Sequence, residues 1–266
     1  MSPSLEIRKT ALMWLSETNA INKAEGVQTF GLDALSYVIE PNIQLTSTVN
    51  IPGCPEKPEL VSPLNVKKRS MRTLEGRAAL LHALAHIEFN AINLALDAIW
   101  RFSDMPEAYY LDWLKVAAEE AYHFSLLNTH LASLGYQYGD FNGHNSLWEM
   151  VDKTKGDVLA RMALVPRTME ARGLDANPAL RKKLAQAGDL RAAEVMDIIL
   201  ADEIGHVAIG NHWFNYLCEK DKLEPLSIFA QLCQTYAAPK LRGPFNLEAR
   251  RKAGFSEAEL LNLTHT

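Results

Sequence analysis

Residues 188–214, GDLRAAEVMDIILADEIGHVAIGNHWF, predict one long helix that carries a polar pair on an apolar face. Asp189 follows Gly188 and is a suitable N-cap. The residues that share one face at steps of three and four are Ala192, Val195, Met196, Ile199, Glu203, His206, Gly210 and Trp213. A carboxylate and an imidazole that face a protein core are costly without a compensating partner. We expect this partner to be a metal pair shared with three other helices.

The same pattern occurs earlier in the chain. Residues 118–123, AEEAYH, and residues 201–206, ADEIGH, both have the order Ala-acid-Glu-x-x-His. Each copy is followed by an asparagine five residues after its histidine, Asn128 in the first copy and Asn211 in the second. The glutamate and the histidine of each copy are three residues apart, so they lie on the same side of a helix.

A lone glutamate precedes each copy at nearly the same distance. Glu88 lies 32 residues before Glu120, and Glu170 lies 33 residues before Glu203. The chain therefore contains two half-sites in sequence, each made of a glutamate and then Glu-x-x-His. This is the ligand set of di-iron and di-manganese carboxylate bundles, in which two helices supply one glutamate each and two supply Glu-x-x-His.

The charge of such a site favours metal binding. Four carboxylates in a bundle core would repel one another and largely protonate, whereas two divalent cations would balance them. Carboxylate and imidazole ligands suit iron or manganese, and structural zinc more often has thiolate ligands. The predicted cofactor is two iron ions, with manganese or a mixed pair as the alternative. The predicted ligands are Glu88, Glu120, His123, Glu170, Glu203 and His206; the alternative is ordinary surface glutamates with two core histidines.

Two further acidic residues and two histidines lie close to these ligands in sequence. Glu119 and Asp202 each precede a motif glutamate, and either could accept the free ring N–H of a ligating histidine on a neighbouring helix or remain a solvated charge. His82 and His86 have a spacing that can bind zinc. However, His86 projects away from Glu88 on a helix, so we favour a hydrogen-bonded core or interface role for this pair.

The composition is ordinary for a soluble globular protein. The net charge of −5 and the pI near 5.9 argue against binding to nucleic acid or an anionic membrane. Three cysteines without close spacing indicate a reducing compartment. Charged residues interrupt the N-terminal segment before any apolar run develops, and no segment approaches about 18 uninterrupted apolar residues. We therefore expect a cytoplasmic protein without a signal peptide or a membrane span.

The helical periodicity predicts an all-α protein built on four core helices. These cover residues 73–102, 106–134, 157–172 and 189–214. The third is kinked by Pro166 and ends at Gly173. The connection 135–156 is long enough to cross the length of a bundle, which would make the second and third core helices parallel. Shorter helices are predicted at residues 4–22, 147–153, 178–187, 226–236 and 256–263.

At 266 residues the chain could form one large domain or two small ones, and we expect a single domain over residues 1–266. Residues 1–70 would form the first helix and, from residue 25, a proline-rich arm wrapped over the bundle. Residues 73–218 would form the metal-binding bundle, and residues 219–266 a helical tail. Arg242, Arg250 and Arg251 of this tail could attract an anionic substrate, but we favour a plain surface role.

Several segments together are similar to one known family. HALAHIEFNAI from His82, EEAYH from Glu119, MEARGLD from Met169, residues 188–213 and Gly-Pro-Phe-Asn-x-x-Ala-Arg from Gly243 resemble the ferritin-like family catalogued as domain of unknown function 455. The resemblance covers about residues 4–254. It implies a ferritin-like four-helix core with a metal site at the six predicted ligands, but no reaction, because the family lacks an established one. A looser similarity, in fold and ligand set only, extends to di-iron hydroxylases that modify tRNA or quinones, manganese catalases and ferritins.

Three functions are compatible with these features. The first is an oxidoreductase that uses O2 or peroxide on a small-molecule substrate, with the metal pair held by the predicted ligands. The second is a non-catalytic metal-binding protein or a ferroxidase and storage protein. The third is a scaffold that keeps the core without turnover. A homodimer is a further expectation, because bundles of this kind often pair through exposed helix faces.

Overall fold

The computed structural model describes residues 5–67 and 69–265, and its regular elements are helices. Within these ranges there is no strand, and only two isolated β-bridges occur, Glu6 to Val38 and Leu60 to Gly143. The predicted all-α class is therefore confirmed. The contacts group the chain into two compact units, residues 1–146 and 147–266. The expectation of one domain over the whole chain stays a prediction.

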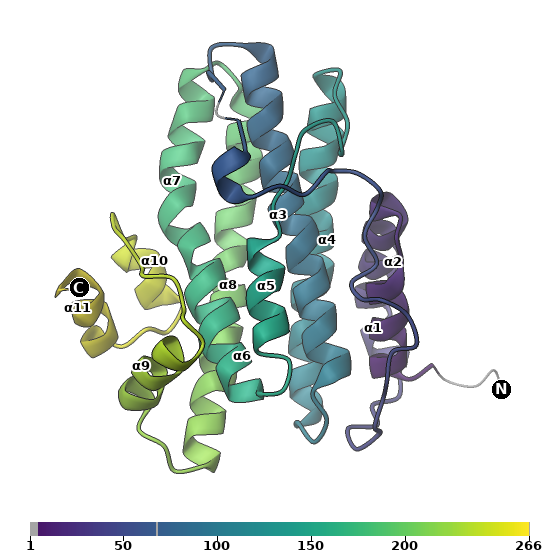
Figure 1. The fold of residues 1–266 in the computed structure, drawn as a ribbon, viewed down its shortest axis with the longest axis vertical. Helices are drawn as coiled ribbons and strands as arrows, with labels where there is room; N and C mark the ends of the chain where they lie inside the picture. The colour runs from purple at the N-terminus through teal and green to yellow at the C-terminus, as the bar shows by residue number, and fades with distance from the viewer. Residues whose placement is uncertain (1–4, 68, 266) are drawn as a thin grey trace. The chain divides into compact units, whose positions relative to one another are not determined.

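The first unit is built around two long helices, α3 (Leu74–Arg101) and α4 (Glu107–Ser133). Thr73 caps α3 by accepting a hydrogen bond from the backbone N–H of Gly76, and Gly135, with a φ of 83°, follows the end of α4. The two helices run side by side in opposite directions, because only residues 102–106 connect them (Figure 1). Both core helices predicted in this half of the chain are confirmed.

The N-terminal region contains two helices where we predicted one. These are α1 (Ile7–Ser16), which packs on α3, and α2 (Ala20–Leu32), which packs mainly on α4. The predicted helix 4–22 also includes residue 4, which lies outside the described residues. Asn19 causes the break, because its side chain accepts hydrogen bonds from two backbone N–H groups of the following turn and starts a new helix. The irregular arm therefore begins after residue 32 and not at residue 25.

The arm is attached to the helices of this unit by two buried basic side chains, Lys23 and Arg8. Nζ of Lys23 donates to the carbonyl of Gly53 over 2.9 Å and to Oδ1 of Asn93 over 2.6 Å. The Arg8 guanidinium donates to the carbonyl of Pro41 in the arm over 3.0 Å and to that of Trp100 near the end of α3 over 2.7 Å. Each of these side chains thus links the arm to a helix, Lys23 through Asn93 of α3 and Arg8 through the last turn of α3. Two short 3₁₀ helices, η1 (Ala34–Ser36) and η2 (Pro63–Asn65), lie within the arm.

The second unit contains the other two predicted core helices and the tail. Asp189 caps the longest helix of the chain by accepting from the N–H of Ala192, as predicted. This helix, α8 (Leu190–Lys220), packs along α7 (Ala171–Gln186) (Figure 1). The elements are α5 (Ser146–Lys153), α6 (Val158–Leu164), the π-helical turn η3 (Val165–Glu170), α7 (Ala171–Gln186), α8 (Leu190–Lys220), α9 (Pro225–Thr235), α10 (Leu247–Lys252) and α11 (Glu257–His265).

The third core helix does not end at Gly173 as predicted. Instead α7 continues through Gly173 and Pro178 to residue 186, so the predicted short helix 178–187 is part of it. A proline inside a helix leaves the carbonyl four residues earlier without its helical donor. Here that carbonyl belongs to Leu174, and Nδ2 of Asn246 donates to it over 3.2 Å. A side chain from the tail thus replaces the missing backbone donor.

Pro166 lies in a π turn of the third core helix, and the kink predicted at this residue stays a prediction. The N–H of Ala171 bonds the carbonyl of Pro166, five residues earlier, which is the π-helical pattern. The proline ring packs against α8 at Gly210, where an added Cβ would lie 2.4 Å from the Cβ of Pro166. The glycine therefore makes room for the widened turn.

Helix α3 is long and apolar enough, by length and composition, to cross a membrane, with a mean hydropathy of 1.3 in its most apolar stretch. However, 78% of that stretch is buried inside the protein, as in the core helix of a soluble protein. The predicted cytoplasmic location stays a prediction.

Candidate metal centre

The first half-site is a group of three polar side chains between α3 and α4. Glu88 comes from α3, and Glu120 and His123 come from α4. Each offers one ligand atom, and these atoms lie within 4.8 Å of one another. Nδ1 of His123 is 3.5 Å from Oε2 of Glu88 and 3.3 Å from Oε2 of Glu120. The spacing of three residues in α4 brings Glu120 and His123 to the same face, as predicted.

This group is buried between the two helices. Glu120 and His123 are fully buried, and Glu88 is 4% exposed. Burial, and the Glu120 carboxylate beside it, raise the pKa of Glu88 to about 8. Among the described residues, the groups that shift this pKa are Glu120 and His123, and neither carries a permanent positive charge. The donor set of two carboxylates and one imidazole therefore fits a divalent cation, which would supply the missing positive charge.

The second half-site lies in the second unit. Glu203 and His206 share a face of α8, with Nδ1 of His206 3.9 Å from Oε2 of Glu203. His206 is fully buried and Glu203 nearly so, with 12% of its side chain exposed. Glu170 is buried at the end of the π turn η3. Among the described residues, Glu170 and His206 belong to no group of three ligand atoms within 4.8 Å of one another. The structure thus places Glu170 and His206 at buried positions and Glu203 at a partly buried one, and it brings the three residues of the first half-site together.

The two predicted supporting acids are half-buried. Oε1 of Glu119 lies 3.9 Å from Nζ of Lys115, one turn earlier on α4. Asp202 is likewise half-buried on α8. The role of these acids as acceptors for a ligating histidine stays a prediction.

His82 and His86 form hydrogen bonds with the segment after α4, as favoured above. Nε2 of His82 accepts from the N–H of Gly139 over 2.9 Å, and Nδ1 of His86 bonds the hydroxyl of Tyr138 over 2.8 Å. The two imidazoles hold this segment on α3. Gly143 packs so closely on His86 that an added Cβ would lie 2.7 Å from Nε2.

Two arginines with buried roles were missed or misassigned. Arg250 is fully buried and forms an ion pair with Asp175, with Nη2 2.6 Å from Oδ2, so the predicted surface role is wrong. Arg167 on η3 is 2% exposed and pairs with Glu259. The Gly-Pro-Phe-Asn-x-x-Ala-Arg segment, which carries part of the family resemblance and ends at Arg250, was the sequence signal that could have indicated more than a surface role. No sequence signal indicated Arg167.

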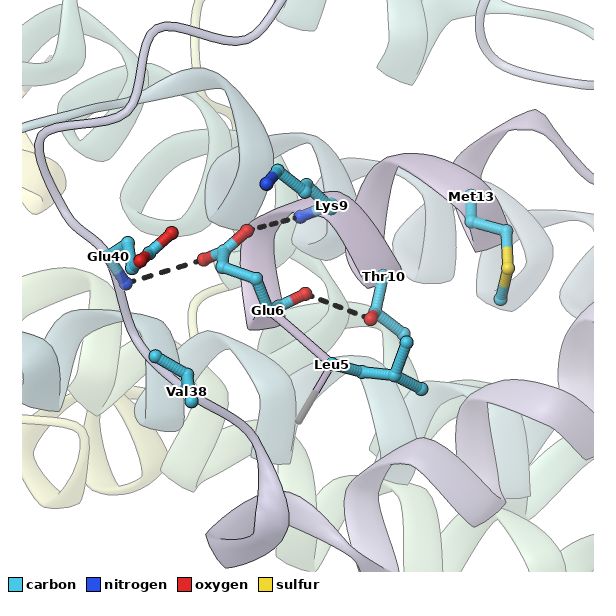
Figure 2. Close-up of a pocket in the computed structure, with 7 residues that line it drawn as sticks. All are labelled: Leu5, Glu6, Lys9, Thr10, Met13, Val38 and Glu40. Carbon is cyan, nitrogen blue, oxygen red and sulfur yellow. Dashed lines mark hydrogen bonds between the residues drawn. The ribbon is translucent and has the colours of Figure 1, made fainter. Parts of the chain in front are cut away.

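A surface pocket of about 400 Å³ in the first unit lies between α1 and the arm (Figure 2). The Glu6 carboxylate at this pocket accepts from the backbone N–H of Lys9 over 2.7 Å, so it serves as the cap of α1. The residues that line the pocket are Leu5, Glu6, Lys9, Thr10, Met13, Val38 and Glu40, and none of them is a predicted metal ligand. The pocket is therefore separate from the Glu88 group.

The three cysteines are free, and burial raises the pKa of each thiol.

Comparison with known proteins gives a family whose function is unknown. A family model described as "Protein of unknown function (DUF455)" matches residues 15–261. A relative from Haemophilus influenzae, described as "Uncharacterized protein", is 54% identical over 218 residues, which covers 79% of this chain and 76% of the relative. No solved structure matches the chain.

Proposed function

Because the chain belongs to the DUF455 family of proteins of unknown function, we propose its function from its own residues: a dinuclear metal carboxylate protein that acts as an O2- or peroxide-dependent oxidoreductase. In this proposal α3 and α4 of the first unit and α6–η3–α7 and α8 of the second form a ferritin-like four-helix bundle. The proposed ligands are Glu88, Glu120, His123, Glu170, Glu203 and His206. The matching order and spacing of the two half-sites support their use as one centre.

The observation that carries the proposal is the buried group of Glu88, Glu120 and His123. Two carboxylates and an imidazole lie within 4.8 Å of one another inside the protein. Groups that are costly to bury are retained where they bind or react, and a pKa raised to about 8 at Glu88 marks this position as such a place. A metal cation is the partner that best fits this donor set.

The glutamates and the histidines would have different roles at this centre. The glutamates would hold the cations and neutralise their charge, and the neutral imidazoles would complete the ligand shells. Burial of the group would exclude bulk water, which strengthens the electrostatic interactions within it. A bound iron or manganese pair would supply the reaction with O2 or peroxide. We propose a small molecule as the substrate and the cytoplasm as the location.

Metal analysis with an oxygen-consumption assay tests this function. The expected result is two iron or manganese ions per chain and consumption of O2 or peroxide by the reduced protein. Glu120→Gln should abolish both signals, whereas Glu107→Gln, at an exposed position of the same helix, should leave them unchanged. Many irons per chain would indicate storage instead, and two metals without a redox response would indicate a structural site. A folded chain that binds no metal would overturn the proposal.

A further inference from the structure

We infer that Arg167 is a positioning residue that couples the docking of the C-terminal segment, α10 to α11 (residues 247–265), to the placement of Glu170. Through Glu170 it would also affect binding of the second metal ion. The metal part of this inference rests on the proposed function. Arg167 lies in the π turn η3, three residues before Glu170, and is 2% exposed. Its position inside the turn means that a shift of Arg167 also shifts the backbone that carries Glu170.

The guanidinium of Arg167 joins three elements of the second unit. Nε donates to Oδ1 of Asn211 on α8 over 2.5 Å, and Nη2 donates to the carboxylate of Glu259 on α11. Asn211 in turn donates from Nδ2 to the carbonyl of Ala253, between α10 and α11, over 2.6 Å. The C-terminal segment is therefore bonded both to η3 and to α8. Asn211 is the asparagine that follows the second Glu-x-x-His motif, so this network gives that residue a role.

Aromatic rings fix the guanidinium on its other sides. Its central carbon lies 4.1 Å from the ring centre of Phe214, 5.0 Å from that of Phe229 and 5.3 Å from that of Phe255. A cation held between ring faces and bonded to a carboxylate in a dry environment has few alternative positions. Removal of its carboxylate partner leaves an uncompensated buried charge, which is strongly destabilising.

The C-terminal segment also packs directly behind the ligand-bearing turns. Ala253, Phe255 and other apolar residues of this segment form one buried cluster with Ala171 and Val207. Ala171 follows Glu170 in sequence, and Val207 follows His206. Docking of the segment thus supports the backbone of both proposed ligands. Arg167 connects this packing to η3 through a charged bond.

Glu259→Gln tests the coupling, because it removes the charge and keeps an acceptor that can still cap α11. Its matched control is Glu257→Gln, since Glu257 lies on the same helix and pairs with Arg251 at the surface. The first measurement is amide hydrogen exchange of residues 165–170 in the metal-free protein. The second is titration with Co²⁺ followed by absorption, which resolves the first and second equivalents. We expect Glu259→Gln to accelerate exchange in η3 and to weaken the second equivalent about tenfold, as for other partners behind metal ligands.

The two measurements separate the parts of the inference. Unchanged exchange in Glu259→Gln, or an equal change in Glu257→Gln, would overturn the role of Arg167 in holding η3. Faster exchange with an unchanged second Co²⁺ equivalent would overturn the coupling to Glu170. A wild-type chain that binds no Co²⁺ would overturn the proposed function and the metal part of the inference, while the exchange data would still decide whether the segment holds the π turn.

Discussion

Nδ1 of His123 on α4 lies 3.5 Å from Oε2 of Glu88 on α3, inside the first unit. This contact joins the two long helices at the position where both bury a polar group. A proton and a metal cation compete for the carboxylate oxygens at such a position, because either one can compensate the buried negative charge.

Metal binding at this site should therefore release a proton. Burial and Glu120 raise the pKa of Glu88 to about 8, so at pH 7 this carboxyl group is protonated in the metal-free protein. Cation binding requires the ionised form, and affinity should rise with pH until about pH 8 and then level off. Calorimetric titration with Mn²⁺ in two buffers of different ionisation enthalpy measures the released proton. In Glu88→Gln the proton release should disappear; release of the same size would show that Glu88 is not a ligand.

The stability of the protein should decline in mild acid because of His82. Burial, and secondarily His86, lower the pKa of His82 from 6.5 to about 4. Between these values the unfolded chain binds more protons than the folded one, so the stabilisation is complete above pH 6.5 and is lost as pH falls towards 4. The expected loss is about 3 kcal/mol. Urea unfolding at several pH values measures it, and His82→Gln should show a smaller decline, since glutamine keeps an acceptor for Gly139 and does not titrate. An equal decline in both proteins would contradict this.

The buried ion pair of the tail should contribute strongly to folding. Asp175→Ala leaves the fully buried Arg250 guanidinium without its counter-charge, which should lower the free energy of unfolding by about 3–5 kcal/mol. The comparison is Glu248→Ala, which breaks the exposed pair with Lys252 and should leave stability unchanged. Chemical denaturation of both variants measures their free energies of unfolding. A small effect in Asp175→Ala would mean that the tail adds little to the second unit.

Two glycines of α8 should respond to alanine in opposite directions. In Gly210→Ala the new Cβ would lie 2.4 Å from the Cβ of Pro166, a ring atom that cannot rotate away, and the cost should be about 1–3 kcal/mol. At Gly205 no atom lies within 4 Å of an added Cβ, so alanine should stabilise the helix by roughly 0.5–1 kcal/mol. Thermal unfolding of the two variants and the wild type measures both changes in stability. Equal effects of the two substitutions would show that η3 does not depend on the close contact at Gly210.

The sequence was sufficient to predict helices whose first residue, buried face and last residue are determined by neighbouring residues. α3 and α4 each combine a long apolar stripe with a recognisable stop, and α3 and α8 also have a polar N-cap. The placement of Glu120 and His123 on one face could be predicted from their spacing of three, which is a local pattern. The addition of Glu88 from α3 was predicted from the repeated order of the two half-sites, which is not local.

Features that depend on distant residues could not be predicted in this way. Gly173 and Pro178 would usually end a helix, but Asn246 supplies the donor that the proline lacks. Arg250 is an arginine in a charged tail, where a surface position is usual. Its burial depends on Asp175, which lies 75 positions away in the sequence. The π turn likewise required the partner helix, since Gly210 provides its space.

The hydrogen bond from Asn246 to the carbonyl of Leu174 also has a consequence for the order in which the protein folds during its synthesis. The two residues are 72 positions apart, so α7 emerges from the ribosome well before the side chain that completes it. Until then the carbonyl of Leu174, four residues before Pro178, lacks a donor from the protein. The second unit can therefore reach its final structure only after translation has passed the tail.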